Sequence, residues 1–244
     1  MDRIFFPAMA LLFLFIVLFG FAQTFYLVGI VPLPPWKHNF AGPHPLIVHV
    51  HGAALTAWFV LLVIQTLLVA KGDLRLHRRL GYVGMGIAVS VVVLGFLVVC
   101  EHLARAFPPG DSRIAAKGGG SLTTLFDLVV FGALVAFAYV YRHYPAAHKR
   151  LILIGTIGIL PPALARWPVL IAGHFWVGVM VTYALVVVIG IYDLISRRRV
   201  HPATVAGGLF YFALRNSWLN DALGSSGPWF ELAVHAQNFG HYLY

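Results

Sequence analysis

The chain has 244 residues, of which 60% are hydrophobic and 10% are charged, and its net charge is +9. Soluble domains carry about 25% charged residues, so the composition excludes an ordinary soluble protein and predicts a polytopic helical membrane protein. The basic residues lie in short connections between apolar runs, which is the pattern of membrane topology and excludes nucleic acid as a partner. The single cysteine, Cys100, excludes an internal disulfide and a zinc or iron–sulfur site built from several cysteines.

Hydropathy predicts an all-α bundle of about seven transmembrane helices in the bilayer. The first helix starts at Ile4 and is too long for the apolar core of a signal peptide. The last is interrupted by Arg215 and Asn216. Residues 1–220 are expected to form one transmembrane domain, and residues 221–244 an aromatic interfacial segment on the outer side. The predicted spans are 4–31, 45–70, 80–100, 121–141, 150–171, 175–195 and 202–220.

The basic residues predict the orientation of these helices. Eleven of them lie at Arg3 and in the connections 71–79, 142–150 and 196–201. Five lie in the alternating connections 32–44, 101–120 and 166–174. Because cytoplasmic loops are enriched in lysine and arginine, the N-terminus and the three more basic connections are expected in the cytoplasm.

Several of the twelve histidines recur at one spacing. His51 and His77 are 26 residues apart, and His174 and His201 are 27 apart. Each separation corresponds to about 40 Å of helix, or roughly one bilayer with its headgroups. Imidazoles at both membrane faces indicate ligands for haem or for a metal, and ordinary interfacial residues are the alternative interpretation.

Three predicted helices begin with histidine on the cytoplasmic side. His77–Arg78 opens one, His148–Lys149–Arg150 a second and His201 a third. In the functional interpretation an imidazole binds a haem iron, while Arg78 or Arg150 pairs with the propionates. In the alternative interpretation these residues are anchors and topology signals that need no ligand.

A second set of polar residues lies within the predicted spans. His51, Trp58 and Gln65 follow one another at intervals of seven residues and share a helix face. Lipid cannot satisfy such a stripe, so Trp58 and Gln65 are expected to line a cavity or to bond across helices. Asp127 and Arg166 are further cavity-lining candidates and are expected to form an ion pair.

The consecutive prolines Pro161 and Pro162 lie inside the predicted span 150–171. Two prolines remove two backbone donors and predict a kink or a break near the middle of the membrane. Broken helices persist at that depth where they line a cavity or are buried in protein.

The motifs His49–Val50–His51–Gly52, Leu76–His77–Arg78–Arg79–Leu80–Gly81 and His148–Lys149–Arg150–Leu151 resemble those of a family of uncharacterised bacterial multi-pass membrane proteins with seven helices. The resemblance covers most of the chain and implies the bacterial inner membrane, but it implies no activity.

The arrangement also resembles, more distantly, that of transmembrane dihaem cytochromes b. In those proteins four core helices carry two haems, each bound by two histidines near one membrane face. The resemblance implies an outer haem on His51 and His174 and an inner haem on His77 with His201 or His148. The two helices between the halves, and Pro202 in place of the usual arginine, depart from that pattern.

Three functions stay open from the sequence. The first is haem b electron transfer, with a quinone or other membrane redox subunits as partners. The second is an enzyme acting on lipid with zinc or another divalent metal at the outer face. Its candidate ligands are His51, His174, His102 and Asp127, with Glu101 as a base. The third is a non-catalytic subunit or assembly factor of a membrane complex.

Overall fold

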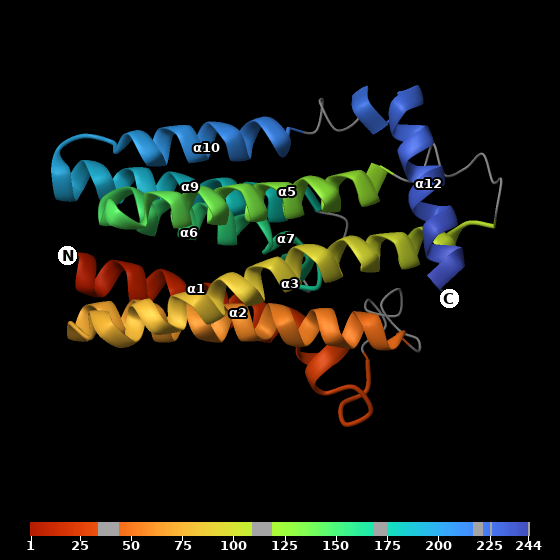
Figure 1. Ribbon diagram of the computed structural model, residues 1–244, viewed down its shortest axis with the longest axis horizontal. Coiled ribbons are helices and arrows are strands. Elements are labelled where there is room, and N and C mark those ends of the chain that lie inside the picture. Colours follow the sequence, from red (N-terminus) through yellow and green to blue (C-terminus); the bar gives the residue numbers. More distant parts are fainter. Residues whose placement is uncertain (34–43, 109–118, 168–174, 217–221, 225, 244) are drawn as a thin grey trace.

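The computed structural model describes residues 1–33, 44–108, 119–167, 175–216, 222–224 and 226–243, and its elements are all helices (Figure 1). Helix α1 is extended by the π-helical turn Ala22–Tyr26, and a 3-10 turn, Tyr141–His143, separates α5 from α6. The helices are α1 Asp2–Phe21, α2 Leu46–Lys71, α3 Leu74–Ala106, α5 Gly119–Val140, α6 Pro145–Gly158, α7 Pro161–Leu164, α9 Phe175–Arg197, α10 Pro202–Leu214 and α12 Gly227–Leu243.

Five helices are long and apolar enough to cross a membrane. They cover Asp2–Tyr26, Leu46–Lys71, Leu74–Ala106, Ser121–His143 and Val177–Arg197. Helix α10 is apolar but has only 13 residues, and α6 has 14. The all-helical fold with several apolar helices is the one expected of an integral membrane protein.

Local sequence signals set the ends of the helices at the short connections before α3, α6 and α10. Gly72 ends α2 with φ of +87°, a left-handed conformation that glycine adopts without strain. The side chain of Asp73 then accepts a hydrogen bond from Leu76 N and caps α3. Pro145 and Pro202 occupy the first turns of α6 and α10, where proline costs no backbone hydrogen bond.

Several predicted spans differ from the observed helices. The first helix ends at Tyr26 rather than at residue 31, and α10 ends at Leu214 rather than at residue 220. Helix α3 begins at Leu74 rather than at residue 80, because hydropathy excludes basic residues that in fact form its first turns. The span expected at 150–171 ends at Gly158 and is followed by the single turn of α7. Pro161 and Pro162 open that turn, so the predicted proline break is confirmed.

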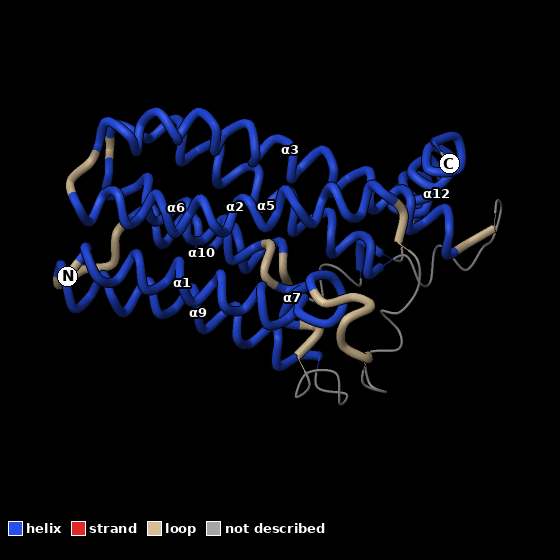
Figure 2. The backbone as a smooth tube through the Cα atoms, turned by 90° about the horizontal axis from the view of Figure 1, so that it is seen from below, coloured by secondary structure: helices blue, strands red, loops and turns tan. Residues whose placement is uncertain are grey.

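The long helices lie side by side along the length of the bundle (Figures 1 and 2). Helix α2 packs between α1 and α3, while α6 packs against α5, α9 and α10. Helix α12 lies across the end opposite to the N-terminus and packs on α3 (Figure 1). There Gly240 approaches Cys100 so closely that an added Cβ would lie 2.3 Å from the Cys100 carbonyl oxygen.

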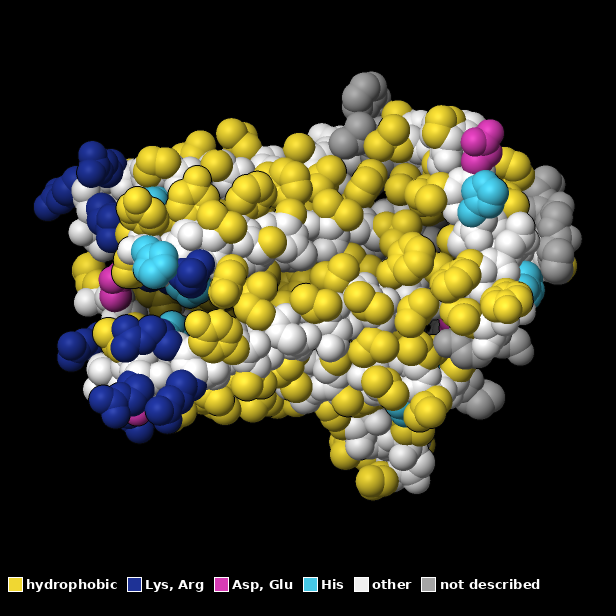
Figure 3. Space-filling view, in the orientation of Figure 1, with side chains coloured by type: hydrophobic (Ala, Val, Ile, Leu, Met, Phe, Trp, Pro, Cys, Tyr) yellow, Lys and Arg dark blue, Asp and Glu magenta, His cyan; other side chains and the backbone are white. Residues whose placement is uncertain are grey.

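Lysine and arginine side chains gather at the end of the bundle that holds the N-terminus (Figure 3). The rest of the visible face is mostly hydrophobic. Exposed aliphatic and aromatic side chains continue along α1, α2 and α9. We call the first region the basic end of the bundle, and the region around α12 the far end.

Candidate functional site

His77 and His148 lie together at the basic end. His77 is near the start of α3 and His148 near the start of α6, and their ring centroids are 6.3 Å apart with an interplanar angle of 86°. His148 Nδ1 lies 2.9 Å from the carbonyl oxygen of Ala138. Because a carbonyl only accepts, Nδ1 carries the proton and Nε2 keeps its lone pair. His77 Nδ1 is buried and has no hydrogen-bond partner in the described part of the chain.

Gln65 connects α2 to this pair. Its Nε2 donates to the carbonyl oxygen of His77 over 3.2 Å, whereas its Oε1 is buried without a partner among the described residues. Gly81 lies one turn after His77 on the same face of α3. A Cβ added at Gly81 would meet only Gln65 Nε2, at 3.9 Å, so the helix face beside the imidazoles is bare.

A buried ion pair lies deeper in the basic end. Arg150 of α6 donates from Nε to both carboxylate oxygens of Asp193, over 2.8 and 3.1 Å, and also from Nη2. Both side chains have 0% exposure. The Thr204 hydroxyl donates to Asp193 over 2.6 Å and the backbone N–H of His201 over 3.0 Å, so one carboxylate holds together α6, α9 and α10.

This ion pair changes the roles expected for the arginines at the basic end. Arg150 was expected to pair with a haem propionate, but its guanidinium is buried against Asp193 and Ala146. Arg78 is exposed beside His77 and keeps its guanidinium at the surface. Asp193 was missed from the sequence, although an acidic residue within an apolar helix is the same signal that identified Asp127.

His201 caps α10 rather than facing the other imidazoles. Its Nδ1 accepts a hydrogen bond of 3.1 Å from Ala203 N, which requires the neutral ring. Burial, with the nearby Arg150 and Arg197, lowers the pKa of His201 below its ordinary value. Of the two inner pairings, the structure therefore brings together His77 with His148 and gives His201 a structural contact.

Toward the far end, Asp127 pairs with Arg215. The two charged atoms Nη1 and Oδ1 are 3.2 Å apart, and both side chains are buried. The expected partner, Arg166, is wrong: its guanidinium donates to the Pro162 carbonyl and lies 4.4 Å from the Phe21 ring centroid. The sequence gives the position of a residue along its helix but not which neighbouring helix it faces. In the fold it is Arg215, not Arg166, that contacts Asp127 of α5.

Several polar atoms around the Asp127–Arg215 pair have no hydrogen bond of ordinary geometry among the described residues. They are Asp127 Oδ1, Arg215 Nε and the hydroxyl of Tyr211, a side chain with 0% exposure. The Tyr183 hydroxyl donates a hydrogen bond to the Arg215 carbonyl over 2.8 Å, and its ring packs edge-on against Tyr211. The cluster is a polar region between α5, α9 and α10 within an otherwise apolar interior.

The remaining predicted residues are spread over the bundle. Trp58 is buried in the core and donates to the Thr156 hydroxyl over 3.2 Å, so it bonds across helices. His51 is half-buried, and its Nδ1 has no partner in the described part of the chain. Its ring lies against α3, because a Cβ added at Gly95 would be 3.1 Å from His51 Cε1.

The outer metal candidates do not form a cluster among the residues described. No group of three or more histidine, cysteine, aspartate or glutamate side chains lies together in that part of the chain. His102 is exposed, and Glu101 is paired with Arg105 at 3.1 Å. His174, the proposed partner of His51, lies outside the described residues.

Comparison of the chain with protein-family models, curated proteins and solved structures finds no match. The functional argument therefore rests on the contacts of its own residues.

Proposed function

We propose that the protein is an electron-transfer protein of the bacterial inner membrane, with haem b bound by His77 and His148. This proposal is based on the distance between the two imidazole rings. Two imidazoles on opposite sides of one metal, at about 2 Å per bond, hold their centroids about 6 Å apart. The observed centroid separation is 6.3 Å.

The donor chemistry of the pair fits such a group. A metal-binding histidine nearly always donates its second ring nitrogen to a carbonyl or carboxylate, as His148 Nδ1 does to Ala138. The unpartnered, buried His77 Nδ1 supplies the second donor. Gly81 leaves the face of α3 beside the pair without a side chain, which favours the approach of a flat ligand.

Neighbouring residues have distinct roles in this arrangement. Gln65 holds the start of α3 against α2 through the His77 carbonyl and thereby fixes the position of that imidazole. Arg78 has an exposed guanidinium that is available to pair with a propionate, whereas the guanidinium of Arg150 is buried in an ion pair with Asp193. Haem with two histidine ligands is six-coordinate, which suits one-electron transfer rather than oxygen chemistry.

The same proposal includes seven crossings with the N-terminus in the cytoplasm. The five long helices would be joined by α6 with α7 and by α10. The gathering of basic side chains at one end supports this orientation (Figure 3). A second centre near the outer face would use His51 and His174, and a membrane quinone or another redox subunit would exchange the electron.

An absorption spectrum of the purified protein tests the proposal. Protein from haem-replete cells is expected to show a reduced-minus-oxidised haem b spectrum. His77→Ala and His148→Ala are each expected to remove the inner centre, halving the haem content if the outer centre also exists. His143→Ala is the matched control, because His143 is an exposed imidazole at the same end of the bundle.

A colourless preparation, or full haem content in both ligand variants, would refute haem binding at this pair. Stoichiometric zinc without haem would favour the metal-dependent lipid enzyme. A protein with neither would favour a non-catalytic subunit or assembly factor.

A further inference from the structure

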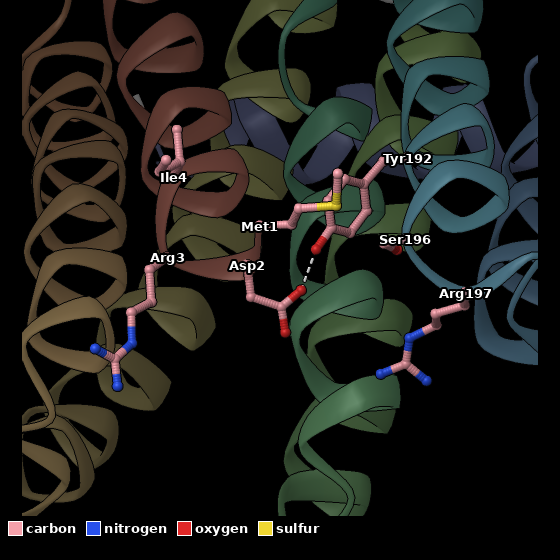
Figure 4. A pocket seen from close by; sticks show the side chains of 7 residues that line it. All are labelled: Met1, Asp2, Arg3, Ile4, Tyr192, Ser196 and Arg197. Carbon is pink, nitrogen blue, oxygen red and sulfur yellow. Dashed lines mark hydrogen bonds between the residues drawn. The ribbon is translucent and has the colours of Figure 1, made fainter.

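A pocket of about 590 Å³ opens at the basic end, apart from the imidazole pair (Figure 4). It lies between the first turn of α1 and the last two turns of α9. Because both helices are long and apolar enough to cross a membrane, their ends, and the pocket with them, would lie at the level of the lipid headgroups. Its lining residues are Met1, Asp2, Arg3, Ile4, Tyr192, Ser196 and Arg197.

The charge in the pocket is positive although an aspartate lies at its centre. Asp2 is paired with Lys149 and accepts a hydrogen bond from the Tyr192 hydroxyl, so its own charge is compensated. Arg3 and Arg197 are exposed, and neither pairs with an acidic side chain within the described residues. Figure 4 shows them on either side of Asp2 with their guanidinium groups pointing the same way.

The walls of the pocket are held rigid on the α9 side. The Tyr192 ring stacks on Phe5 with a centroid distance of 3.8 Å, and its hydroxyl is fixed by Asp2. The Ser196 hydroxyl is buried beside the Tyr192 hydroxyl, one turn further along α9. An oxygen-rich anion between the two arginines would therefore meet a further hydroxyl donor in the wall of the pocket.

An apolar surface continues from the pocket along α1. Ile4 is 76% exposed, and Leu11 and Phe15 are exposed further along the same helix. Two cations at the headgroup level, followed by an apolar helix face, are complementary to an amphiphile with an anionic head. Free phosphate would use the cations but would leave the apolar surface without a partner.

The geometry points to a binding site for an anionic phospholipid of the inner leaflet. Its phosphodiester lies between Arg3 and Arg197, the Ser196 hydroxyl donates to a phosphate oxygen, and the acyl chains follow α1 past Ile4. Arginine suits this role because its planar fork of donors matches phosphate oxygens. Basic pockets at the cytoplasmic side of helical bundles are recognised sites for anionic lipid heads.

The assignment to the inner leaflet rests on the proposed orientation, but the site itself does not depend on haem. The test is lipid binding by the full-length protein in lipid discs, measured by native mass spectrometry as retained lipid. Discs contain either phosphatidylglycerol in phosphatidylcholine or phosphatidylcholine alone. Because discs expose both faces, the result is independent of orientation, and the haem spectrum of the same sample reports separately on the proposed function.

Wild-type protein is expected to retain phosphatidylglycerol in preference to phosphatidylcholine. Each of Arg3→Gln and Arg197→Gln is expected to weaken that retention about fivefold, the effect of one basic residue near an anionic surface. The matched control is Arg75→Gln with Arg79→Gln, which removes two exposed charges from the same end but outside the pocket.

Equal loss in the control and in the pocket variants would overturn the proposal, since it would show only a general surface charge effect. Absence of a preference for phosphatidylglycerol in the wild type would overturn it as well. Glycerol phosphate that displaces the lipid at equal concentration would assign the site to a soluble anion instead. Circular dichroism of each variant establishes that it is folded, and these substitutions at exposed positions are expected to leave the helices intact.

Discussion

Replacing Asp193 by asparagine should destabilise the bundle strongly. Asparagine keeps the shape of the side chain but removes the charge that compensates Arg150. Both side chains have 0% exposure, so the guanidinium would remain buried without a counter-charge. Breaking a buried ion pair from one side costs about 3–5 kcal/mol.

This free energy corresponds to a large shift in melting temperature. One kcal/mol shifts Tm by about 2–4 °C in a chain of this size, so Asp193→Asn is expected to lower Tm by about 6–20 °C. The assay is thermal unfolding of detergent-solubilised protein, followed by circular dichroism. A matched control is Lys149→Gln, because its partner Asp2 is 54% exposed and Lys149 is 22% exposed, so water solvates the carboxylate that is left and the loss should be about 1 kcal/mol.

The double variant Asp193→Leu with Arg150→Met distinguishes charge from packing. Replacing both members of a buried pair by apolar residues is often neutral or stabilising, so this variant should recover most of the lost Tm. An Asp193→Asn protein that melts within about 2 °C of the wild type would refute the reasoning, since the assumed penalty is about 3–5 kcal/mol.

Two further predictions concern the ends of α10. The neutral His201 ring accepts a hydrogen bond from Ala203 N–H, and burial with the nearby arginines lowers the pKa of His201 below 6.5. The contribution of this cap to the free energy of unfolding should therefore be fully present above pH 6.5 and decrease as the pH falls below it. His201→Asn keeps a capping side chain and should flatten this decline in melts from pH 5 to 8; an unchanged slope would contradict the assignment. Asp127→Asn leaves Arg215 buried and should cost about 3 kcal/mol in the same melts, the lower end of the range for a buried pair, because the contact is made by one nitrogen at 3.2 Å. Ser90→Ala, on the exposed face of α3, serves as its control, and equal Tm in the two variants would count against a stabilising Asp127–Arg215 ion pair.

The helices themselves could be predicted because apolar runs, prolines and glycines are local signals. The predicted start of the span 175–195 agrees with α9, and the expected break at Pro161 and Pro162 is observed. Helix α3 was predicted too short because hydropathy discounts arginine. Those arginines have long apolar stems that allow their charges to reach the surface from the first turns.

The partners of polar side chains on neighbouring helices were harder to predict than the position of each residue along its own helix. Asp127 was placed correctly inside a span, but its partner is Arg215 and not Arg166. A periodic pattern places residues on a common face of one helix, whereas the choice of neighbour depends on how the helices are arranged around each other. The same limit applies to His201, which was predicted at a depth similar to that of His77, whereas its ring caps α10.

The short length of helix α10 explains why buried charged residues lie at its two ends. Its 13 residues span about 20 Å, less than the hydrocarbon thickness of about 30 Å. A helix of this length that starts at the basic end does not reach the opposite surface, so its last C=O groups need polar partners inside protein, because lipid cannot satisfy them. Asp193 accepts from the His201 N–H at the first end, and Tyr183 donates to the Arg215 carbonyl at the other.

The signs of these charges also suit the helix dipole. The carboxylate of Asp193 lies at the positive N-terminal end of α10, and Arg215 lies at its negative C-terminal end. Arg150 and Asp127 then neutralise these two residues from α6 and α5. Two buried ion pairs thus attach a helix that is too short to span alone, which accounts for both pairs without requiring either to act on a ligand.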